Sequence, residues 1–446
     1  MTLPDRLKIK DLDATNGEYD AEKLRLYWAM YAGGQFFRDV VDEVIIKRAI
    51  EEKSTQIGQR SYAERKKRAC YINRTGGFID WAVAEICKDE PRITVEGGTE
   101  DQQAYWESMN LDADGFGTPF PAIVRRLLVD EMVSRYAYVG LSQDEQDAAR
   151  VNFFRINPCE VLDWERSADD GKLTFSKVKS VRPYREVEYL PPVGDVVRWT
   201  ISIPGKIAVY EAIKKKNQYH DEAGRVVEYA QLVEQEEIDT EIPLHTAQIQ
   251  RSQWVVDRIY DPARQLFNTE LDQAFALSEA AYPQLVLTVE NRNNIDGIIK
   301  SELNAIVLET GDSINYLLPQ KWCFDPMDRQ ITNLKNALHE TVQLMAKEAA
   351  SIPQAGRMSG ETVKEMRQPV ISLLRSYSWP ILEVLNRVID QIKDIRREPD
   401  LEVSITGLVD ISDEIEMPNV GEIGMNSAPA VGSDQRSEEE EESGDE

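Results

Sequence analysis

Residues with the right chemistry for catalysis occur in this sequence, but none stands at the spacing that a known catalytic site requires. The segment HETVQLM begins like a zinc-binding helix with His339 and Glu340, yet Gln343 stands where a second histidine would close the site. The glycines of EGGTE, from Glu96, and of GFGTP, from Gly115, lack the spacing and the strand-to-helix context of a phosphate-binding loop. We interpret both as turns. The sequence contains no G-x-S-x-G nucleophile elbow.

Metal and redox chemistry are no better supported. The carboxylates that could imitate a metal cluster stand in an acidic run, which favours a solvated segment; they are Asp410, Asp413, Glu414 and Glu416. The cysteines form no C-x-x-C pair and are too few to cross-link a chain of this length, which fits a reducing compartment; they are Cys70, Cys87, Cys159 and Cys323. The sequence therefore predicts a protein that is not an enzyme and that needs no metal and no cofactor.

The charge of the chain is strongly acidic and unevenly distributed. Its 446 residues carry 79 Asp and Glu against 52 Lys and Arg, a net charge of −27. From Glu398 to Glu446 there are 16 acidic residues and one arginine. A protein that grips nucleic acid through its phosphates needs a basic face, which this composition does not offer. The local basic clusters are expected to be solvated helix faces or subunit contacts; they are Arg65-Lys66-Lys67-Arg68, Arg125-Arg126, Lys214-Lys215-Lys216 and Arg396-Arg397.

The chain is longer than one hydrophobic core usually supports, so we expect two or three structural modules. Apolar residues at helical spacing predict a helical block from Asp20 to Glu52, broken at Gly33-Gly34. A second block is predicted from about Ser61 to Lys88, broken at Gly76-Gly77. EPRITVEGGTE is predicted as a turn with a short strand, and PFPAIVRRLLVDEMVSRY as another amphipathic helix.

From Tyr136 to Ile259 the apolar period changes to two. In VVRWTISIP, Trp199 and Ile201 alternate with polar residues, as in a strand with one face toward solvent. Further strands are predicted at VNFFRINP, LTFSKVKSV, KIAVYEAI and VVEYAQLV, with HDEAGR as a turn. Helices followed by an antiparallel β-rich module place the chain in the α+β class.

The stretch from Pro262 to Glu361 contains the element order around which the chain is organised. ARQLFNTELDQAFALSEAAY predicts a helix that Pro283 stops, and PQLVLTV and NAIVLETGDSINYLL predict a small strand-containing excursion. ITNLKNALHETVQLMAKEAA predicts a second helix, which ends in the loop SIPQAGRMSGE. The residues of the apolar stripe on the two helices include Phe267, Leu271, Phe275, Leu334, Leu338, Val342 and Met345.

A third long helix is predicted from Ser359 to Arg397. It contains Pro369 and Pro380, each of which removes a backbone donor and clashes with the carbonyl four residues before it. We therefore expect a bent or segmented helix. LEVSITGLVDI predicts one more strand, and beyond Glu414 the loss of aromatic residues and of periodicity predicts a mobile acidic tail.

This order of elements resembles that of the bacteriophage portal proteins, the head-tail connector rings of tailed phages. DPARQLFNTELDQAFALSEAAYPQLVLT is similar to a portal's first stem helix running into the clip, and IPQAGRMSGETVKEM is similar to the tunnel loop and the helix that follows. YAERKKRACYINRTGGFIDWAVAEICKDEPRI is similar to the N-terminal wing. The resemblance implies a wing at 1–261, a first stem helix at 262–282, a small α/β clip at 283–325, a second stem helix at 326–350, a tunnel loop at 351–360, a long kinked wing and crown helix at 361–397, and a crown end with an acidic flexible tail at 398–446.

The same resemblance implies a function without catalysis. Identical subunits would form a ring, usually a dodecamer, at one capsid vertex, and double-stranded DNA would pass through it during packaging and ejection without sequence specificity. The implied partners are the large terminase, a head-tail adaptor, and the major capsid protein or scaffold. The tunnel-loop residues implied to lie nearest the DNA are Gln354, Arg357 and Met358, and a plain helix-helix connector remains the alternative. The clip residues implied to meet partners are Asn291, Arg292, Asn293, Asn294 and Asp296.

Ring closure requires one surface of a subunit to meet a different surface of the next. The apolar stripe would then be partly subunit core and partly inter-subunit seam; an ordinary monomeric helical core is the alternative. Between Pro262 and Ala350 there are 12 Asp and Glu against 7 Lys and Arg, a net charge of −5. Such a wall repels a duplex, which suits a conduit.

The expected location is the virion, at the portal vertex, after assembly in the cytoplasm of a bacterial host. No stretch of the sequence reaches the length of about 18 apolar residues that a membrane span needs. One alternative function is that of a soluble acidic protein-protein interaction module without a channel. Another is an enzyme whose site is assembled from residues that are distant in the sequence.

Overall fold

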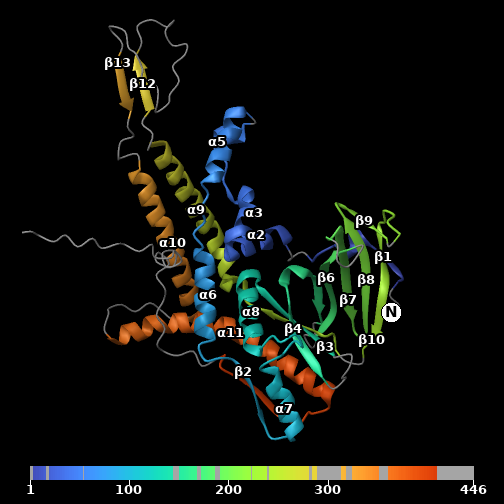
Figure 1. Cartoon of the computed structure of the whole chain (residues 1–446). Coiled ribbons are helices and arrows are strands. Elements are labelled where there is room, and N and C mark those ends of the chain that lie inside the picture. Colours follow the sequence, from blue (N-terminus) through green and yellow to red (C-terminus); the bar gives the residue numbers. More distant parts are fainter. Residues whose placement is uncertain are drawn as a thin grey trace, which may run out of the picture.

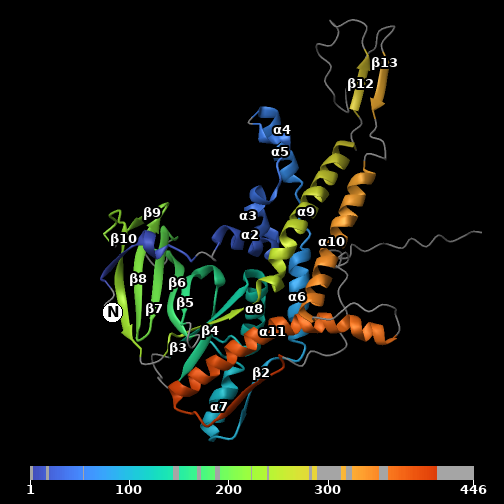
Figure 2. The same cartoon turned by 180° about the vertical axis from the view of Figure 1, so that it is seen from behind.

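The computed structural model describes residues 4–16, 20–53, 55–143, 150–167, 172–185, 191–221, 223–238, 241–280, 284–288, 313–317, 324–350 and 360–408. Figures 1 and 2 show two long helices side by side, a twisted sheet module away from them, and shorter helices between. A third long helix, α11 (Gly360–Arg396), crosses the base of this arrangement. The fold is α+β.

The N-terminal helices follow the predicted blocks, with one correction. α2 (Ala21–Ala32) and α3 (Gly34–Val44) are separated at Gly33, whose φ of 62° lies in the left-handed region that favours glycine. The predicted break at Gly76-Gly77 is wrong, because α6 (Arg74–Ile86) runs through both glycines. A Cβ on Gly76 would stand 2.4 Å from the Tyr31 carbonyl oxygen, so this glycine permits close packing against α2. The other helices of this part are α1 (Ile9–Leu12), α4 (Ala49–Glu52), α5 (Gln56–Lys67), α7 (Glu100–Met109) and α8 (Phe120–Ser134).

The main hydrophobic core surrounds α8, which contacts α2, α6, α9 (Val255–Ala280) and α11. Two acids on α8 are fully buried. Asp130 accepts two hydrogen bonds from the Arg155 guanidinium. The carboxylate oxygens of Glu131 have no hydrogen-bond partner among the described residues, and burial raises the pKa of Glu131 well above its ordinary value. Burial therefore favours the neutral form of the Glu131 carboxyl.

The sheet module is a seven-stranded antiparallel sheet in the order β1-β10-β8-β7-β6-β5, with β9 added to β8. Trp199, Ile201 and Tyr210 are buried on one face, where Ile9 and Leu12 of α1 join them. The predicted antiparallel module is thus confirmed. Its strands are β1 (Arg6–Lys8), β5 (Val161–Arg166), β6 (Leu173–Tyr184), β7 (Gly194–Ile203), β8 (Lys206–Lys215), β9 (Gln218–His220) and β10 (Tyr229–Glu237).

Two smaller sheets join segments that lie far apart in the chain. β3 (Tyr136–Gln143) lies between β4 (Val151–Ile156) and β11 (Leu244–Gln248). β14 (Glu402–Thr406), the predicted last strand, pairs antiparallel with β2 (Arg92–Glu96). This pairing ties the end of α11 back to the N-terminal helices.

Two of the long helices begin earlier than predicted. α9 begins at Val255 rather than at Pro262, because Val255 and Val256 are buried in the main core and their packing offsets the cost of about 3 kcal/mol for an interior proline. α10 (Asp325–Ala350) begins one residue before its predicted start. Between them, β12 (Gln284–Thr288) and β13 (Ser313–Leu317) form an antiparallel pair. α11 changes direction along its length, as expected for a helix that contains two prolines.

Candidate functional site

The candidate functional site is the pair of long helices α9 and α10 with the hairpin beyond them. Each helix has 26 residues, which at about 1.5 Å per residue makes a rod of about 39 Å. Figures 1 and 2 show the two rods side by side, with β12 and β13 beyond their upper ends. The pair therefore projects from the body of the chain as one long, narrow element.

Most of the predicted apolar stripe that the structure describes on this pair is buried within the chain. Phe267 and Leu271 of α9 and Leu338 and Val342 of α10 belong to the main core, and Leu334 packs against that core. The stripe therefore holds the two rods together and fixes them to the shorter helices. Its share in a seam between subunits stays a prediction.

Phe275 of the predicted stripe lies half-buried beneath two arginine side chains. The guanidinium carbons of Arg48 and Arg68 lie 4.9 and 5.5 Å from the centre of its ring. Both arginines belong to the α4–α5 lobe, which we define as residues 46–53 and 55–68. Figures 1 and 2 show this lobe beside the upper part of α9. A cation over an aromatic face contributes about 0.5–1 kcal/mol at a partly exposed position, so Phe275 helps to hold the lobe on α9.

Glu270 connects α9 to helices on two sides. Its carboxylate accepts hydrogen bonds of 2.8 and 3.1 Å from the Arg74 guanidinium of α6, and it lies 3.8 Å from the Lys335 ammonium of α10. Gln273 of α9 also donates to the Asp328 carboxylate of α10. Arg74 and Glu270 are largely buried and make a two-bond contact, which is stronger than an exposed ion pair. Sequence reasoning missed the pair because the two residues stand 196 positions apart.

α9 also closes the C-terminal end of α3. Arg264 donates from Nε to the Val44 carbonyl and from Nη2 to the Glu43 carbonyl, each at 3.0 Å. Asn268 donates from Nδ2 to the Val44 carbonyl at 3.1 Å. The last carbonyls of a helix have no partner inside the helix and carry partial negative charge. A cation and an amide of α9 satisfy them, so the end of α3 is fixed to the rod.

The basic cluster that begins at Arg65 departs from prediction. Arg65 is 1% exposed and donates to Glu51 from Nε at 3.1 Å and to Asp272 of α9 from Nη1 at 2.8 Å. Burial opposes the ionisation of Glu51, but hydrogen bonds from the Arg48 backbone amide and from Arg65 outweigh it and lower the pKa of Glu51. The prediction of a solvated face or a subunit contact is therefore wrong for Arg65, whose acidic partner on α9 is 207 positions away. The other three basic clusters lie at exposed or half-buried positions.

α10 presents a polar side to its surroundings. Among residues 325–342 the exposed positions are polar apart from one proline; they are Asp325, Pro326, Asp328, Arg329, Gln330, Thr332, Asn333, Asn336 and Glu340. On α9, by contrast, Glu270 and Asp272 are already neutralised by arginines of α5 and α6. On the described part of the pair, most of the exposed acidic charge is therefore on α10, and Asp261 is an exposed acid on α9.

Several predicted residues lie outside the described part of the chain, so their roles stay predictions. They are the tunnel-loop residues Gln354, Arg357 and Met358, the clip residues Asn291, Arg292, Asn293, Asn294 and Asp296, the side chain of Met345, and the acidic tail with Asp410, Asp413, Glu414 and Glu416.

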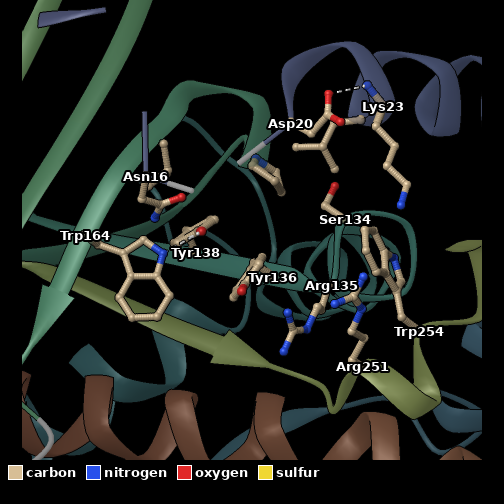
Figure 3. A pocket seen from close by; sticks show the side chains of 13 residues that line it. Asn16, Asp20, Lys23, Ser134, Arg135, Tyr136, Tyr138, Trp164, Arg251 and Trp254 are labelled. Carbon is tan, nitrogen blue, oxygen red and sulfur yellow. Dashed lines mark hydrogen bonds between the residues drawn. The ribbon is translucent and has the colours of Figure 1, made fainter. Parts of the chain in front are cut away.

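A cavity of about 230 Å³ opens where α2, the start of β3 and the 3-10 helix Arg251–Gln253 meet. Figure 3 shows aromatic rings on one side of it and two arginines with a tryptophan on the other: Tyr136, Tyr138, Trp164, Arg135, Arg251 and Trp254. Two of its cations are already engaged, since Lys23 lies 2.5 Å from Asp257 and Arg135 donates to the Ile249 carbonyl at 3.3 Å. Its lining comes from segments far apart in the chain, so no sequence motif predicted it.

The described ranges contain neither a metal-binding cluster nor a membrane-spanning helix. There, no three His, Cys, Asp or Glu side chains gather where they could hold a metal ion. Nor does any described helix combine the length and the hydropathy that crossing a bilayer requires.

Comparison with known proteins gives a distant likeness in structure alone. No model of a protein family matches the sequence, and no curated protein is similar to it. A chain from the "Neck of empty GTA particle computed with C6 symmetry" is similar in structure, with a TM-score of 0.35 and 11% sequence identity. The alignment covers 77% of this chain and 84% of that chain. We draw no functional conclusion from so distant a likeness, and the chain is assigned to no family.

Proposed function

We propose that this protein is the subunit of a portal-like ring in a phage-related particle, where it forms the channel for double-stranded DNA during packaging and ejection. The observation that carries the proposal is the pair of antiparallel rods, joined through a β-hairpin and fixed to the body along one side. The residues of α9 and β12 resemble a portal stem helix running into its clip, and α10 fits the portal order of elements.

The two rods have different roles in this proposal. α9 is the structural rod, because Arg264, Asn268 and Glu270 join it to α3 and α6. α10 is the channel rod, because its described exposed side is polar and carries more acid than base. A duplex has about one negative charge per ~1.7 Å of its axis, so this wall repels DNA and offers few phosphate contacts to break at each step.

The remaining parts follow from the same resemblance. The hairpin of β12 and β13 is the clip that meets the large terminase during filling and a head-tail adaptor afterwards. The sheet module and the shorter helices are the wing, which faces the major capsid protein or scaffold. Gln354, Arg357 and Met358 approach the DNA from the loop after α10. The ring is a dodecamer, and the packaging ATPase supplies the energy, so this chain performs no catalysis.

Native mass spectrometry of the purified protein tests the proposal. We expect one dominant species at a large integer multiple of the 50.9 kDa chain, which ring closure requires. A monomer or dimer at all protein concentrations would contradict the proposal and favour an acidic interaction module without a channel. Glu270→Gln is an informative variant, because it weakens the contacts of α9 with Arg74 and Lys335 and should reduce the yield of the large species. Glu340→Gln on the exposed side of α10 is its matched control and should assemble like the wild type.

A further inference from the structure

The α4–α5 lobe is built with its polar groups inside and its apolar groups outside. Within the described residues of the lobe, the buried positions are Glu51, Gly58 and Arg65. Its isoleucines are all exposed, Ile46 at 47%, Ile50 at 48% and Ile57 at 72%. Charged residues are rarely buried in a folded chain, and exposed apolar groups that gather on one element mark interaction surfaces. These exposed isoleucines, which we call the apolar side of the lobe, have little cover from the described part of the chain.

The apolar side of the lobe is held in a defined shape. The Arg65 guanidinium fixes α5 to Glu51 and to the Ile46 carbonyl, at 2.8 Å for the latter, and to α9 through Asp272. α4 and α5 also touch backbone to backbone, because a Cβ on Gly58 would stand 2.2 Å from the Ile50 carbonyl oxygen. A surface that is ordered before binding loses little conformational entropy on binding, which favours a specific partner.

The charge of the lobe is opposite to that of the chain. Residues 46–68 contain eight Lys and Arg and three Asp and Glu, a net charge of +5, whereas the whole chain has −27. Most of these cations already have a partner in the chain: Arg65 pairs with Glu51, Lys66 with Asp42, and Lys67 with Glu64. Cations that are already paired within the chain offer few contacts to the phosphates of a nucleic acid. With exposed isoleucines beside them, they suit a protein partner with an acidic surface better.

We propose that the α4–α5 lobe is a docking surface for a second copy of this chain, with Ile50 and Ile57 as its apolar anchors. We rest this on the proposed ring, in which a second copy is present at every subunit and its acidic surface complements the lobe. The contact is heterologous, since the lobe of one copy meets a different surface of the next, as closure of a ring requires. Lys53 and Arg60 have no acidic partner at bonding distance among the described residues, and their charge attracts the acidic surface of the approaching copy.

The test compares matched substitutions in the full-length protein by native mass spectrometry. The double variant Ile50→Asp/Ile57→Asp should convert the large species to monomer while keeping the wild-type circular dichroism and melting temperature. Val181→Asp/Val226→Asp introduces the same two charges at sheet-module residues that are 54% and 62% exposed, and it should assemble normally. An isoleucine double variant that assembles to the wild-type extent would overturn the proposal for the lobe and leave the ring intact. A monomeric wild type would instead contradict the proposed function.

A second measurement keeps the proposal testable should the double variant fold poorly. A photo-activated cross-linking residue in place of Ile57 should yield covalent dimers of this chain, and the yield should fall when Lys53→Glu/Arg60→Glu is added. Absence of dimers from assembled protein would count against the proposal. So would a Lys53→Glu/Arg60→Glu variant that assembles and cross-links as before but loses affinity for duplex DNA, because the lobe would then be a nucleic-acid contact.

Discussion

The seven-stranded sheet and the α4–α5 lobe have opposite distributions of polar and apolar groups. In the sheet, Trp199 and Tyr210 are fully buried against α1. In the lobe, the side chains of Arg65 and Glu51 are buried as an ion pair, and the isoleucines are exposed. Apolar burial is the main source of folding stability, so this core stabilises the sheet within one chain. The lobe instead depends on ion pairs for its shape, and we propose that its exposed isoleucines contact another copy of the chain.

The largest expected effect is on the sheet side of this comparison. Trp199→Ala removes a fully buried ring and its 3.0 Å hydrogen bond to Asp13, and should cost about 3–5 kcal/mol of unfolding free energy in urea titrations. Trp379→Ala on α11 is the matched control, because Trp379 is 57% exposed and the same change there should cost little. Equal losses for the two variants would show that the sheet does not depend on its core.

The next largest effect is expected at the buried ion pair of the lobe. Arg65→Ala leaves Glu51 buried without its cation, which should lower the unfolding free energy by about 3 kcal/mol. Glu51→Leu/Arg65→Met replaces the pair by apolar side chains and should recover most of that loss, since a buried pair stabilises little against a packed apolar substitute. Lys67→Ala, in the same basic cluster but exposed, should change the unfolding free energy by less than about 0.5 kcal/mol. A double variant as unstable as Arg65→Ala would mean that the lobe needs its charges for more than pairing.

A pH series contrasts the paired acid of the lobe with an unpaired acid of the main core. Glu131 has a raised pKa, so its contribution to stability is complete below the unfolded pKa and is lost as pH rises toward the folded value. Compared with Glu131→Gln, the unfolding free energy of the wild type should fall by up to about 1.4 kcal/mol per pH unit above about pH 4.3. Glu51 has a lowered pKa, so the pH dependence should be reversed for this residue. The wild type should be more stable than Glu51→Gln at neutral pH, and this difference in unfolding free energy should disappear as pH falls. Melting temperatures of the wild type and the two variants from pH 4 to pH 8 measure both effects. A difference between wild type and Glu131→Gln that does not change with pH would contradict the raised pKa of this carboxyl.

The smallest effect is expected at the lobe surface. Ile57→Ser should change the unfolding free energy of the dissociated chain by no more than about 0.5 kcal/mol, because Ile57 has little apolar contact to lose. Ile201→Ser in the sheet core is the matched change and should cost several times more. A large loss at Ile57 would place this side chain in the stability of the single chain, and the contrast between the two regions would fail.

Local pattern was sufficient to predict most elements of this fold. The period of two in VVRWTISIP predicted a half-buried strand, and Trp199 and Ile201 are buried in β7 as expected. The helical spacing between Pro262 and Ala350 predicted two rods with strands between them, and the structure contains α9, β12, β13 and α10. Both patterns express burial within one element, which neighbouring residues determine.

Contacts between distant segments were not predictable in the same way. Arg65 stands in a basic run that is typical of a solvated helix face, but it is buried, where it donates a hydrogen bond to Asp272 of α9. Gly76 resembles a helix break, but the Tyr31 carbonyl requires a residue without a side chain there. In each case the contact that determines the environment of the residue comes from another element, and the spacing of neighbouring residues cannot predict it. For the candidate site, sequence therefore predicted the rods and their stripe but missed the anchors at Arg74 and Arg264.

The central claim is that copies of this chain surround an open axis. Electron microscopy of the purified, assembled protein, averaged in the view along its symmetry axis, tests this most directly. We predict a closed ring whose lumen is wide enough for a DNA duplex, with the α10 rods on the inner wall. A particle with a filled centre, or single copies without rotational symmetry, would contradict the account.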